Sequence, residues 1–137
     1  MEDFSKYKIK EYKYWDIFIA QNQSYLGRCV IWCKREDALD LTDATDEETK
    51  ELFSILSKLK NALSIVFQSD WFNYSFLGNS VRHLHCHFIP RYANLKILDG
   101  VKFEDKLYGK NWKSDVNFVI SEELLIKIKS LLSNALK

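Results

Sequence analysis

All three histidines of this 137-residue chain fall at alternate positions of one short window, residues 83–87 (HLHCH). Strict alternation of polar and apolar side chains is typical of a half-buried β-strand, because successive residues of a strand point to opposite faces of its sheet. The window therefore predicts a strand that turns Leu84, Cys86 and Phe88 toward the core and the three imidazoles toward the other face.

Two pairs of strands are expected around this window. Residues 15–21 (WDIFIAQ) and 28–34 (RCVIWCK) are rich in β-branched and aromatic side chains, and residues 24–27 supply the break of a hairpin between them. The histidine strand, residues 84–89, is predicted to pair with residues 72–76 across a short turn.

Two amphipathic helices are also predicted. Thr45 and Glu48 have the spacing of a capping box, which opens a helix that runs to about Gln68. Ser121 caps a second helix near the end of the chain. The expected apolar stripes are Leu52, Ile55, Leu56, Leu59, Leu63 and Val66 in the first helix and Leu124, Leu125, Ile128, Leu131 and Leu132 in the second.

Strands joined by hairpins, with a helix between the pairs and another at the end, predict an α+β fold on an antiparallel sheet. A chain of 137 residues can bury one sizeable core, so we expect a single domain over residues 1–137 with a core at roughly 12–92. Residues 93–137 would hold an irregular segment and the C-terminal helix. Between residues 92 and 117 the periodicity is poor, and the aromatic side chains there indicate only that the segment packs on something.

Composition excludes several classes of partner. Twenty basic and 19 acidic residues give a net charge of +1, which leaves no positive field for a nucleic-acid polymer. No apolar run approaches the roughly 20 residues of a membrane span, and residues 1–10 are unlike a signal peptide. Cys29, Cys33 and Cys86 include no CxxC pair and predict buried free thiols. We expect a soluble, cytoplasmic protein with no membrane partner.

A row of three imidazoles can serve metal binding or nucleophilic chemistry. Residues i and i+4 of a strand lie about 13 Å apart, so the three side chains cannot all reach one ion at about 2.1 Å. A metal site would need carboxylates or thiols from elsewhere, and Cys86 points to the other face. For phosphoryl or nucleotidyl transfer the row is useful, because an extended polyphosphate can lie along it while residues 78–81 (GNSV) offer backbone N–H groups, an amide and a hydroxyl.

Residues 83–89 match, position by position, the signature His-φ-His-φ-His-φ-φ of the histidine triad (HIT) proteins, in which φ is apolar. The chain also resembles the family in the turn 78–81, which looks like Gly-Gln-Ser/Thr-Val, and in the segment 25–29 (YLGRC). Residues 90–91 (PR) follow the triad as in the fragile-histidine-triad branch, to which diadenosine polyphosphate hydrolases belong. The likeness covers roughly residues 12–92.

The resemblance implies a HIT-like fold of about five antiparallel strands and two main helices, paired across a homodimer. It implies that His85 is the nucleophile and forms a transient nucleotidyl-phosphohistidine, which water hydrolyses to release a nucleoside monophosphate such as AMP. By the same carry-over His87 would contact phosphate oxygens, His83 would order the row, and Ser80 would lie near the leaving group. Because attack requires a neutral imidazole, activity should fall as the pH drops through the histidine range.

Further substrate contacts are expected from Asn79, Asn73 and Arg28. Asn73 is a candidate for an amide beside the phosphates, although an ordinary strand or turn asparagine explains it equally well. Arg28 stands where several family members carry a fourth histidine, and it could bind phosphate or lie at the surface.

The nucleoside pocket departs from the family pattern. Many members place an acidic or amide residue for the ribose hydroxyls where this chain has Ala20, and Gln21 or Asn22 could replace that contact. Three apolar side chains could wall the base or could simply pack in the core. They are Trp15, Phe18 and Ile31.

The function implied by the resemblance is hydrolysis of a nucleotide phosphoanhydride or phosphoramidate, with dinucleoside polyphosphates such as diadenosine tetraphosphate as the first substrates to test. Nucleotidyl transfer to another acceptor, or regulatory nucleotide binding with little turnover, are the alternatives. The chemistry requires no cofactor and no bound metal, although Mg²⁺ could arrive with the polyphosphate.

Overall fold

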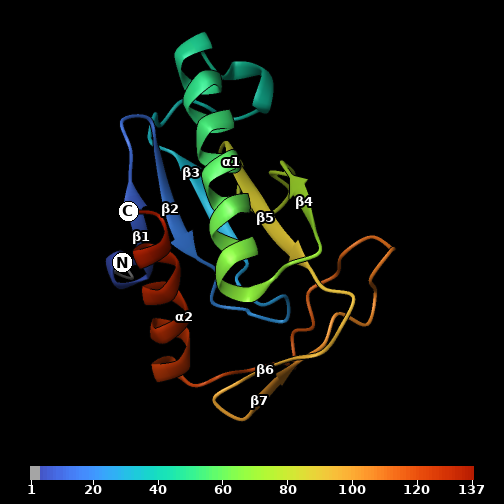
Figure 1. Ribbon diagram of the computed structural model, residues 1–137. Helices are drawn as coiled ribbons and strands as arrows, with labels where there is room; N and C mark the ends of the chain where they lie inside the picture. The colour runs from blue at the N-terminus through green and yellow to red at the C-terminus, as the bar shows by residue number, and fades with distance from the viewer. Residues whose placement is uncertain (1–3) are drawn as a thin grey trace.

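The computed structural model describes residues 4–137, and five of its strands form one antiparallel sheet in the order β1-β2-β3-β5-β4 (Figure 1). The predicted α+β fold is confirmed, with two long helices beside the sheet. The bounds are Lys8–Glu11 for β1, Trp15–Ile19 for β2, Cys29–Cys33 for β3, Trp71–Ser75 for β4, His85–Arg91 for β5, Asp46–Phe67 for α1 and Glu122–Ala135 for α2.

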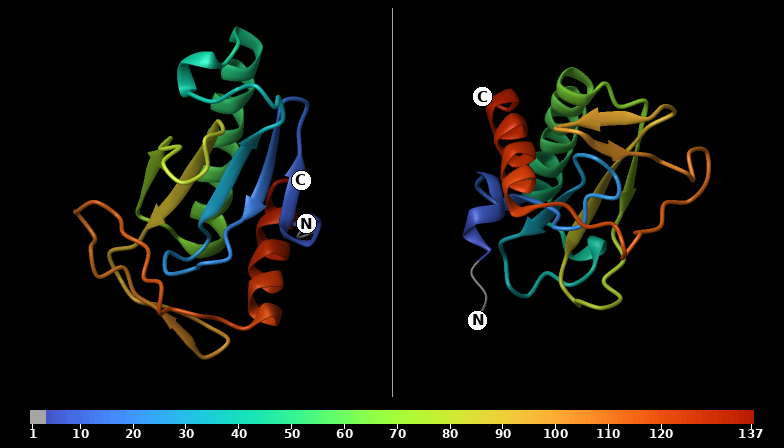
Figure 2. Two further views of the ribbon diagram at one scale, coloured as in Figure 1. Left: turned by 180° about the vertical axis from the view of Figure 1, so that it is seen from behind. Right: turned by 90° about the horizontal axis from the view of Figure 1, so that it is seen from below.

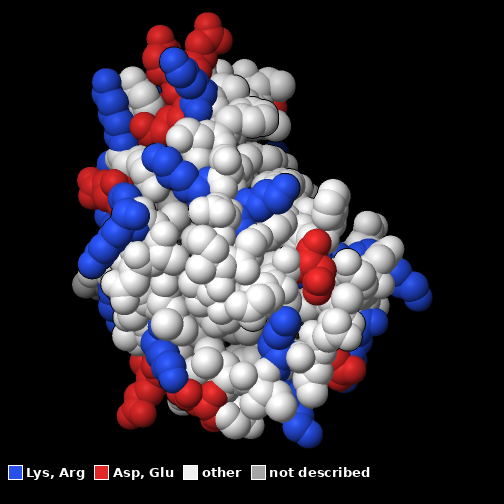
Figure 3. Space-filling model, viewed as in Figure 1, with Lys and Arg blue, Asp and Glu red and all other residues white. Residues whose placement is uncertain are grey.

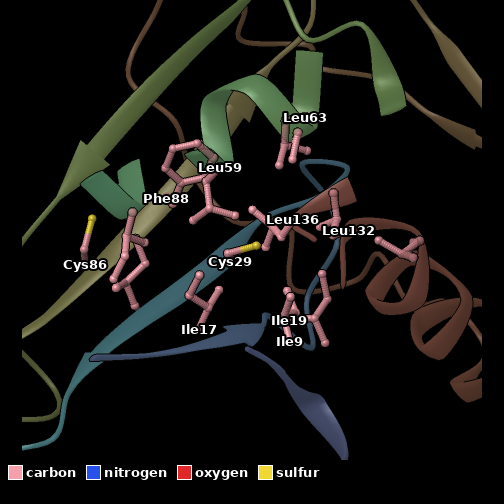
Figure 4. Close-up of a cluster of buried hydrophobic side chains, with 14 of the residues drawn as sticks. Ile9, Ile17, Ile19, Cys29, Leu59, Leu63, Cys86, Phe88, Leu132 and Leu136 are labelled. Atoms are coloured by element: carbon pink, nitrogen blue, oxygen red, sulfur yellow. The ribbon is translucent and has the colours of Figure 1, made fainter. Parts of the chain in front are cut away.

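Both helices lie against the same face of the sheet, so the other face is seen without a helix before it when the molecule is viewed from behind (Figure 2). The core forms between the two helices and the face of the sheet that they cover (Figure 4). The predicted stripes are confirmed, with Leu56, Val66 and Leu131 packed at the margin and the other stripe residues buried. No helix formed by residues 4–137 has the length and apolar character needed to cross a membrane.

Helix α1 begins where the capping box predicts. The Thr45 side chain accepts a hydrogen bond from the Glu48 backbone N–H, and the Glu48 carboxylate accepts one from the Thr45 backbone N–H. The same carboxylate is bound by the Arg35 guanidinium at 3.1 Å, which lowers the pKa of Glu48 to about 2. Acidic side chains gather at this end of α1, at the top of Figure 3, where they suit the positive end of the helix dipole.

The alternation around the triad is confirmed on its core side. Leu84, Cys86 and Phe88 are at most 1% exposed, and Cys29, Cys33 and Cys86 are buried free thiols, as predicted. The strand itself begins at His85, two residues later than the triad does. The backbone N–H of His83 bonds within the preceding loop, to the Val81 carbonyl at 2.9 Å, and so is not available to a neighbouring strand.

The loop between β2 and β3 packs directly on α1. Gly27 has φ +86°, and a Cβ built there would lie 2.3 Å from Leu63 Cδ1. Only glycine combines this backbone conformation with so close an approach. The contact fixes the chain immediately before Arg28 against the core.

Three short strands are not predicted from the sequence. Strand β1 has four residues and a register shift between Lys8 and Lys10, so its alternation is brief. Within residues 92–117, where the sequence has no clear periodicity, β6 (Lys96–Leu98) and β7 (Val101–Phe103) form a hairpin. Asp99 and Gly100 have φ of 50° and 78° at its turn, and an Asp-Gly pair is a recognised hairpin signal.

The rest of that segment is fastened to the sheet by one buried ion pair. Arg91, 3% exposed, binds the Asp105 carboxylate through Nε at 2.7 Å and Nη2 at 3.1 Å. Its two Nη groups also donate to the carbonyls of Leu107 and Lys110, each at 2.7 Å, and to Asn73 Oδ1 at 2.6 Å. The guanidinium therefore holds residues 105–110 over the end of β5.

We predict that Asp105→Asn destabilises the fold by about 3 kcal/mol or more, because it leaves the buried Arg91 charge unpaired. Asp99→Asn is the matched control, since Asp99 pairs with Lys127 at the surface and such pairs contribute about 1 kcal/mol or less. Urea unfolding of both variants measures the difference. Equal losses of stability would show that the Arg91 pair does not anchor the segment.

Candidate active site

The histidine face of the sheet is built from β3 and β5. In the register of these strands Trp32 lies opposite His85 and Val30 lies opposite His87. His85 is the most enclosed of the three, at 8% exposed, whereas His83 and His87 are half-buried. The three imidazoles lie on the face away from the core, as predicted, and the centroids of the His85 and His87 rings are 4.9 Å apart.

Backbone carbonyls orient two of the rings. The Nδ1 atom of His85 is 2.6 Å from the His83 carbonyl oxygen, and Nε2 of His83 is 2.6 Å from the Cys33 carbonyl oxygen. A carbonyl can only accept, so each of these ring nitrogens must carry the proton. In neutral His85 the lone pair is then on Nε2, the nitrogen that faces away from this bond.

An indole ring supports the same two imidazoles. The Trp32 ring stacks on His83 at a centroid distance of 4.1 Å and an angle of 17°, and on His85 at 5.5 Å and 30°. The stack restricts rotation of both histidines. Trp32 was not among the predicted site residues, although its alternation with Ile31 and Cys33 places it on the histidine face.

Arg28 is a buried residue of this site. It is 8% exposed; its Nη1 donates to Ser114 Oγ at 2.5 Å, and its Nη2 lies 3.3 Å from Nδ1 of His87. The guanidinium also packs over the Trp112 ring at 4.8 Å. Of the two predicted positions, phosphate site or surface, the surface position is excluded. Among the residues that the structure describes, no carboxylate pairs with Arg28, and its buried Nε has no hydrogen-bond partner.

The electrostatic setting of His87 is unusual. Burial, together with the positive charge of Arg28 and the neighbouring His85, lowers the pKa of His87 from its usual 6.5 to about 4. His87 is therefore neutral at physiological pH. Because Nδ1 faces the guanidinium as an acceptor, the single proton of the ring is on Nε2.

Two neighbouring cavities meet the histidine face. One, of about 870 Å³, is mostly apolar and is lined by Phe18, Val30 and Trp32, with Arg28 at its polar side. The other, of about 390 Å³, is lined by both His83 and His85 and by the loop before them. Arg82 and Asn79 supply polar groups to this second cavity.

The other residues predicted to contact the substrate are Asn79, Ser80 and Asn73, and they do not all lie next to the triad. Asn79 lines the smaller cavity with His83 and His85, whereas Ser80 is exposed in the same loop. Asn73 lies opposite Ile89 on β4, and its amide oxygen accepts from Arg91. The structure thus brings Asn79 to the triad and ties Asn73 to the anchor of the C-terminal segment.

The structure decides between the two alternatives, a wall of the nucleoside pocket or core packing, for each of the three apolar side chains. Phe18 lines the larger cavity, but Trp15 and Ile31 are fully buried on the core face, because they alternate with the residues that face the site. Ala20 and Gln21 line this cavity as well. Asn22 also borders it, but its amide already donates to the Asp115 carbonyl and accepts from Ser24.

Two site residues come from the segment that could not be assigned from sequence. The Trp112 indole N–H donates to Ser75 Oγ at 2.9 Å, and its ring lies 5.8 Å from that of His87. Ser114 binds Arg28. The segment has no periodicity, so its position depends on long-range contacts that no local pattern indicates.

Comparisons with known proteins agree with this geometry. The family model of the HIT domain matches residues 8–94, more than half of the chain. No curated protein matches the sequence.

Several solved structures share the fold. A histidine triad protein from Marinobacter aquaeolei is 21% identical with a TM-score of 0.76, over 94% of this chain and 87% of that one. One from Bradyrhizobium japonicum is 18% identical with a TM-score of 0.74, over 95% and 90%. The diadenosine triphosphate hydrolase of Plasmodium falciparum is 16% identical with a TM-score of 0.67, over 95% and 76%. With the family model over the triad and its sheet, and with this fold, the chain belongs to the HIT domain family.

Proposed function

We propose that this protein hydrolyses nucleotide phosphoanhydrides or phosphoramidates through a nucleotidyl intermediate on His85. The observation that carries the proposal is the 2.6 Å contact between His85 Nδ1 and the His83 carbonyl oxygen. It fixes the tautomer in which Nε2 has a free lone pair, which is what a nucleophilic imidazole needs. Membership in the HIT domain family supports the same role.

In the first step His85 Nε2 attacks the phosphorus that bears the nucleoside. The N–P bond forms as the bond to the leaving group breaks, and the electron pair of that bond goes to the leaving group. The ring of His85 then carries positive charge, which the His83 carbonyl oxygen stabilises through Nδ1–H and which the stacked Trp32 face also favours.

In the second step water attacks the same phosphorus. A P–O bond forms, the N–P bond breaks, and its electron pair returns to His85 Nε2 while a proton of the water passes to solvent. The products are a nucleoside monophosphate and the leaving group. The burial of the ring supports a single orientation of His85 through both steps.

The phosphate contacts in this proposal come from Arg28 and His87. A buried guanidinium without a carboxylate partner suits a phosphate oxygen, and Nε2–H of neutral His87 can donate a second hydrogen bond. The apolar cavity beside Trp32 and Phe18 would hold the nucleoside, with base stacking on aromatic surface. Asn79 and Ser80 would lie toward the leaving group.

Dinucleoside polyphosphates are the first substrates to test, because one similar structure is that of a diadenosine triphosphate hydrolase. We predict that His85→Ala lowers the release of mononucleotide from diadenosine tetraphosphate by at least about 10³-fold, since the covalent route is lost. Chromatography of the products, with and without a chelator, measures this. A rapid quench of the wild-type reaction, followed by mass spectrometry, should find the nucleotide on His85.

Lys60→Ala is the control, because Lys60 is exposed on α1 and lies away from the histidine face. It should leave turnover unchanged. Equal turnover in His85→Ala and wild type would contradict the nucleophile, and inhibition by the chelator would favour a bound metal. Tight mononucleotide binding without turnover in wild type would favour a regulatory binding protein.

We also propose that two copies pair through β4. This strand bonds to β5 on one side, and no other strand among residues 4–137 pairs with its outer edge. Trp71 and Tyr74 on β4 and Phe53 on α1 are 63%, 43% and 67% exposed. The middle of Figure 3, over α1 and toward β4, is correspondingly poor in charge. A second copy related by a two-fold axis can add its own β4 to this edge.

We predict that light scattering finds a particle of twice the 16.2 kDa chain mass, and that Trp71→Glu combined with Tyr74→Lys returns it to the mass of one chain. Both changes place charge on the edge that would be buried. Val119→Lys, at a site 84% exposed outside β4, is the control and should stay paired. A wild-type particle of single mass would contradict the pairing.

A further inference from the structure

Arg28 gives His87 surroundings that neither of the other imidazoles has. The Nη2 group donates to Nδ1 of His87 at 3.3 Å, so that nitrogen is already occupied as an acceptor. A second proton on His87 would have to be placed on Nδ1, where its N–H would point at the N–H of the guanidinium. The doubly protonated ring would also put a positive charge next to another.

Within residues 4–137, no negatively charged group next to His87 offsets this charge. Arg28 faces it from the loop before β3, His85 from its own strand, Ser75 from β4, and Trp112 from the C-terminal segment. Among the described residues no carboxylate forms an ion pair with either member of the Arg28–His87 pair. The lowered pKa of His87, about 4, agrees with these contacts.

The leaving group decides whether a proton donor is needed. A phosphate leaves readily as an anion, because its second ionisation has a pKa near 6. The amine of a phosphoramidate is far more basic, as amino groups have pKa values of roughly 8–10, and it leaves only after a proton has reached its nitrogen. A site without an imidazolium beside the row serves the first kind of leaving group and not the second.

We infer that the Arg28–His87 pair makes this site selective for anhydrides, whose leaving group departs as phosphate, over phosphoramidates. The inference rests on the proposed function. His85 Nε2 forms the N–P bond, the bridging P–O bond breaks, and its electron pair stays on the departing phosphate without proton transfer. His87 donates a hydrogen bond from Nε2 to phosphate and keeps its proton throughout.

The groups near the smaller cavity agree with an anionic leaving group. Arg82 and Asn79 can bind phosphate oxygens there, and Arg82 does not give up its proton in proteins. His83 binds the Cys33 carbonyl through Nε2 and lies flat on an indole, which assigns it to positioning. Asp40 and Asp43 also line this cavity, and their carboxylates already accept hydrogen bonds from their own loop.

The test compares kcat/KM for diadenosine tetraphosphate and adenosine 5′-phosphoramidate on one protein preparation, so that the fraction of folded enzyme cancels. We expect wild type to favour the anhydride by at least about 10²-fold, the lower end of a general-acid effect. Arg28→Gln removes the positive charge, and its amide oxygen can accept a hydrogen bond from a second N–H of His87. The ratio of kcat/KM for the anhydride to kcat/KM for the phosphoramidate should therefore fall at least about tenfold. Ser114→Ala keeps the Arg28 charge and should keep the ratio.

Each outcome decides a different point. Comparable kcat/KM values in wild type would overturn the inference and leave the proposed function standing. Cleavage of neither substrate would overturn both. Selectivity that persists unchanged in Arg28→Gln would show that Arg28 is not its source.

Histidine NMR gives a readout that is independent of turnover, because the chain has only three histidines to assign. The chemical shifts of His87 should report a neutral ring down to about pH 4 in wild type. In Arg28→Gln the ring should become protonated at a clearly higher pH. If His87 becomes protonated at the same pH in both proteins, the proposed effect of Arg28 on His87 would be wrong. Because the unfolded chain takes up this proton near pH 6.5 and the folded chain only near pH 4, wild-type stability should fall as the pH drops through that interval.

Discussion

The pleat of β5 is the constraint on which the rest of the structure depends. Its alternation sends Cys86 and Phe88 into the core beneath α1 and sends His85 and His87 to the opposite face. A shift of one residue in register would bury the imidazoles and expose the core side chains together. Burial of the core side chains therefore also fixes the position of the histidines, because the register that buries the former is the one that exposes the latter to the site.

Backbone carbonyl groups orient two of the three imidazole rings on the histidine face. The carbonyls of Cys33 and His83 orient His83 and His85 in turn, each over 2.6 Å, and neither depends on a side chain that could rotate away. The arrangement begins in the loop before β5, where His83 leaves the strand and turns its carbonyl toward the next histidine's ring. The break of the strand at this point is thus part of how His85 is oriented.

Local patterns predicted the elements that have strong local signals. These signals involve residues that are close together in the sequence, so one local geometry satisfies each of them. The structure contains the capping box at Thr45, the two helical stripes and the alternation at 84–88. The Asp99–Gly100 turn has an equally local signal, since an Asp-Gly pair favours a tight hairpin. Trp112 contacts Ser75 on β4 and Ser114 contacts Arg28, so their placement depends on the tertiary fold and on no pattern of their own.

The two buried arginines, Arg91 and Arg28, differ in how fully their guanidinium groups are paired. Arg91 has all its donors engaged, by Asp105, by Asn73 and by two carbonyls, and it has nothing left to offer a ligand. Arg28 is buried almost as deeply, yet it has a hydroxyl, an imidazole nitrogen and an aromatic face in place of a carboxylate. A buried cation is costly unless it is paired, so Arg28 is the one of the two that an arriving phosphate would stabilise. In the proposed function, its bond to His87 would link phosphate binding to the protonation of the triad.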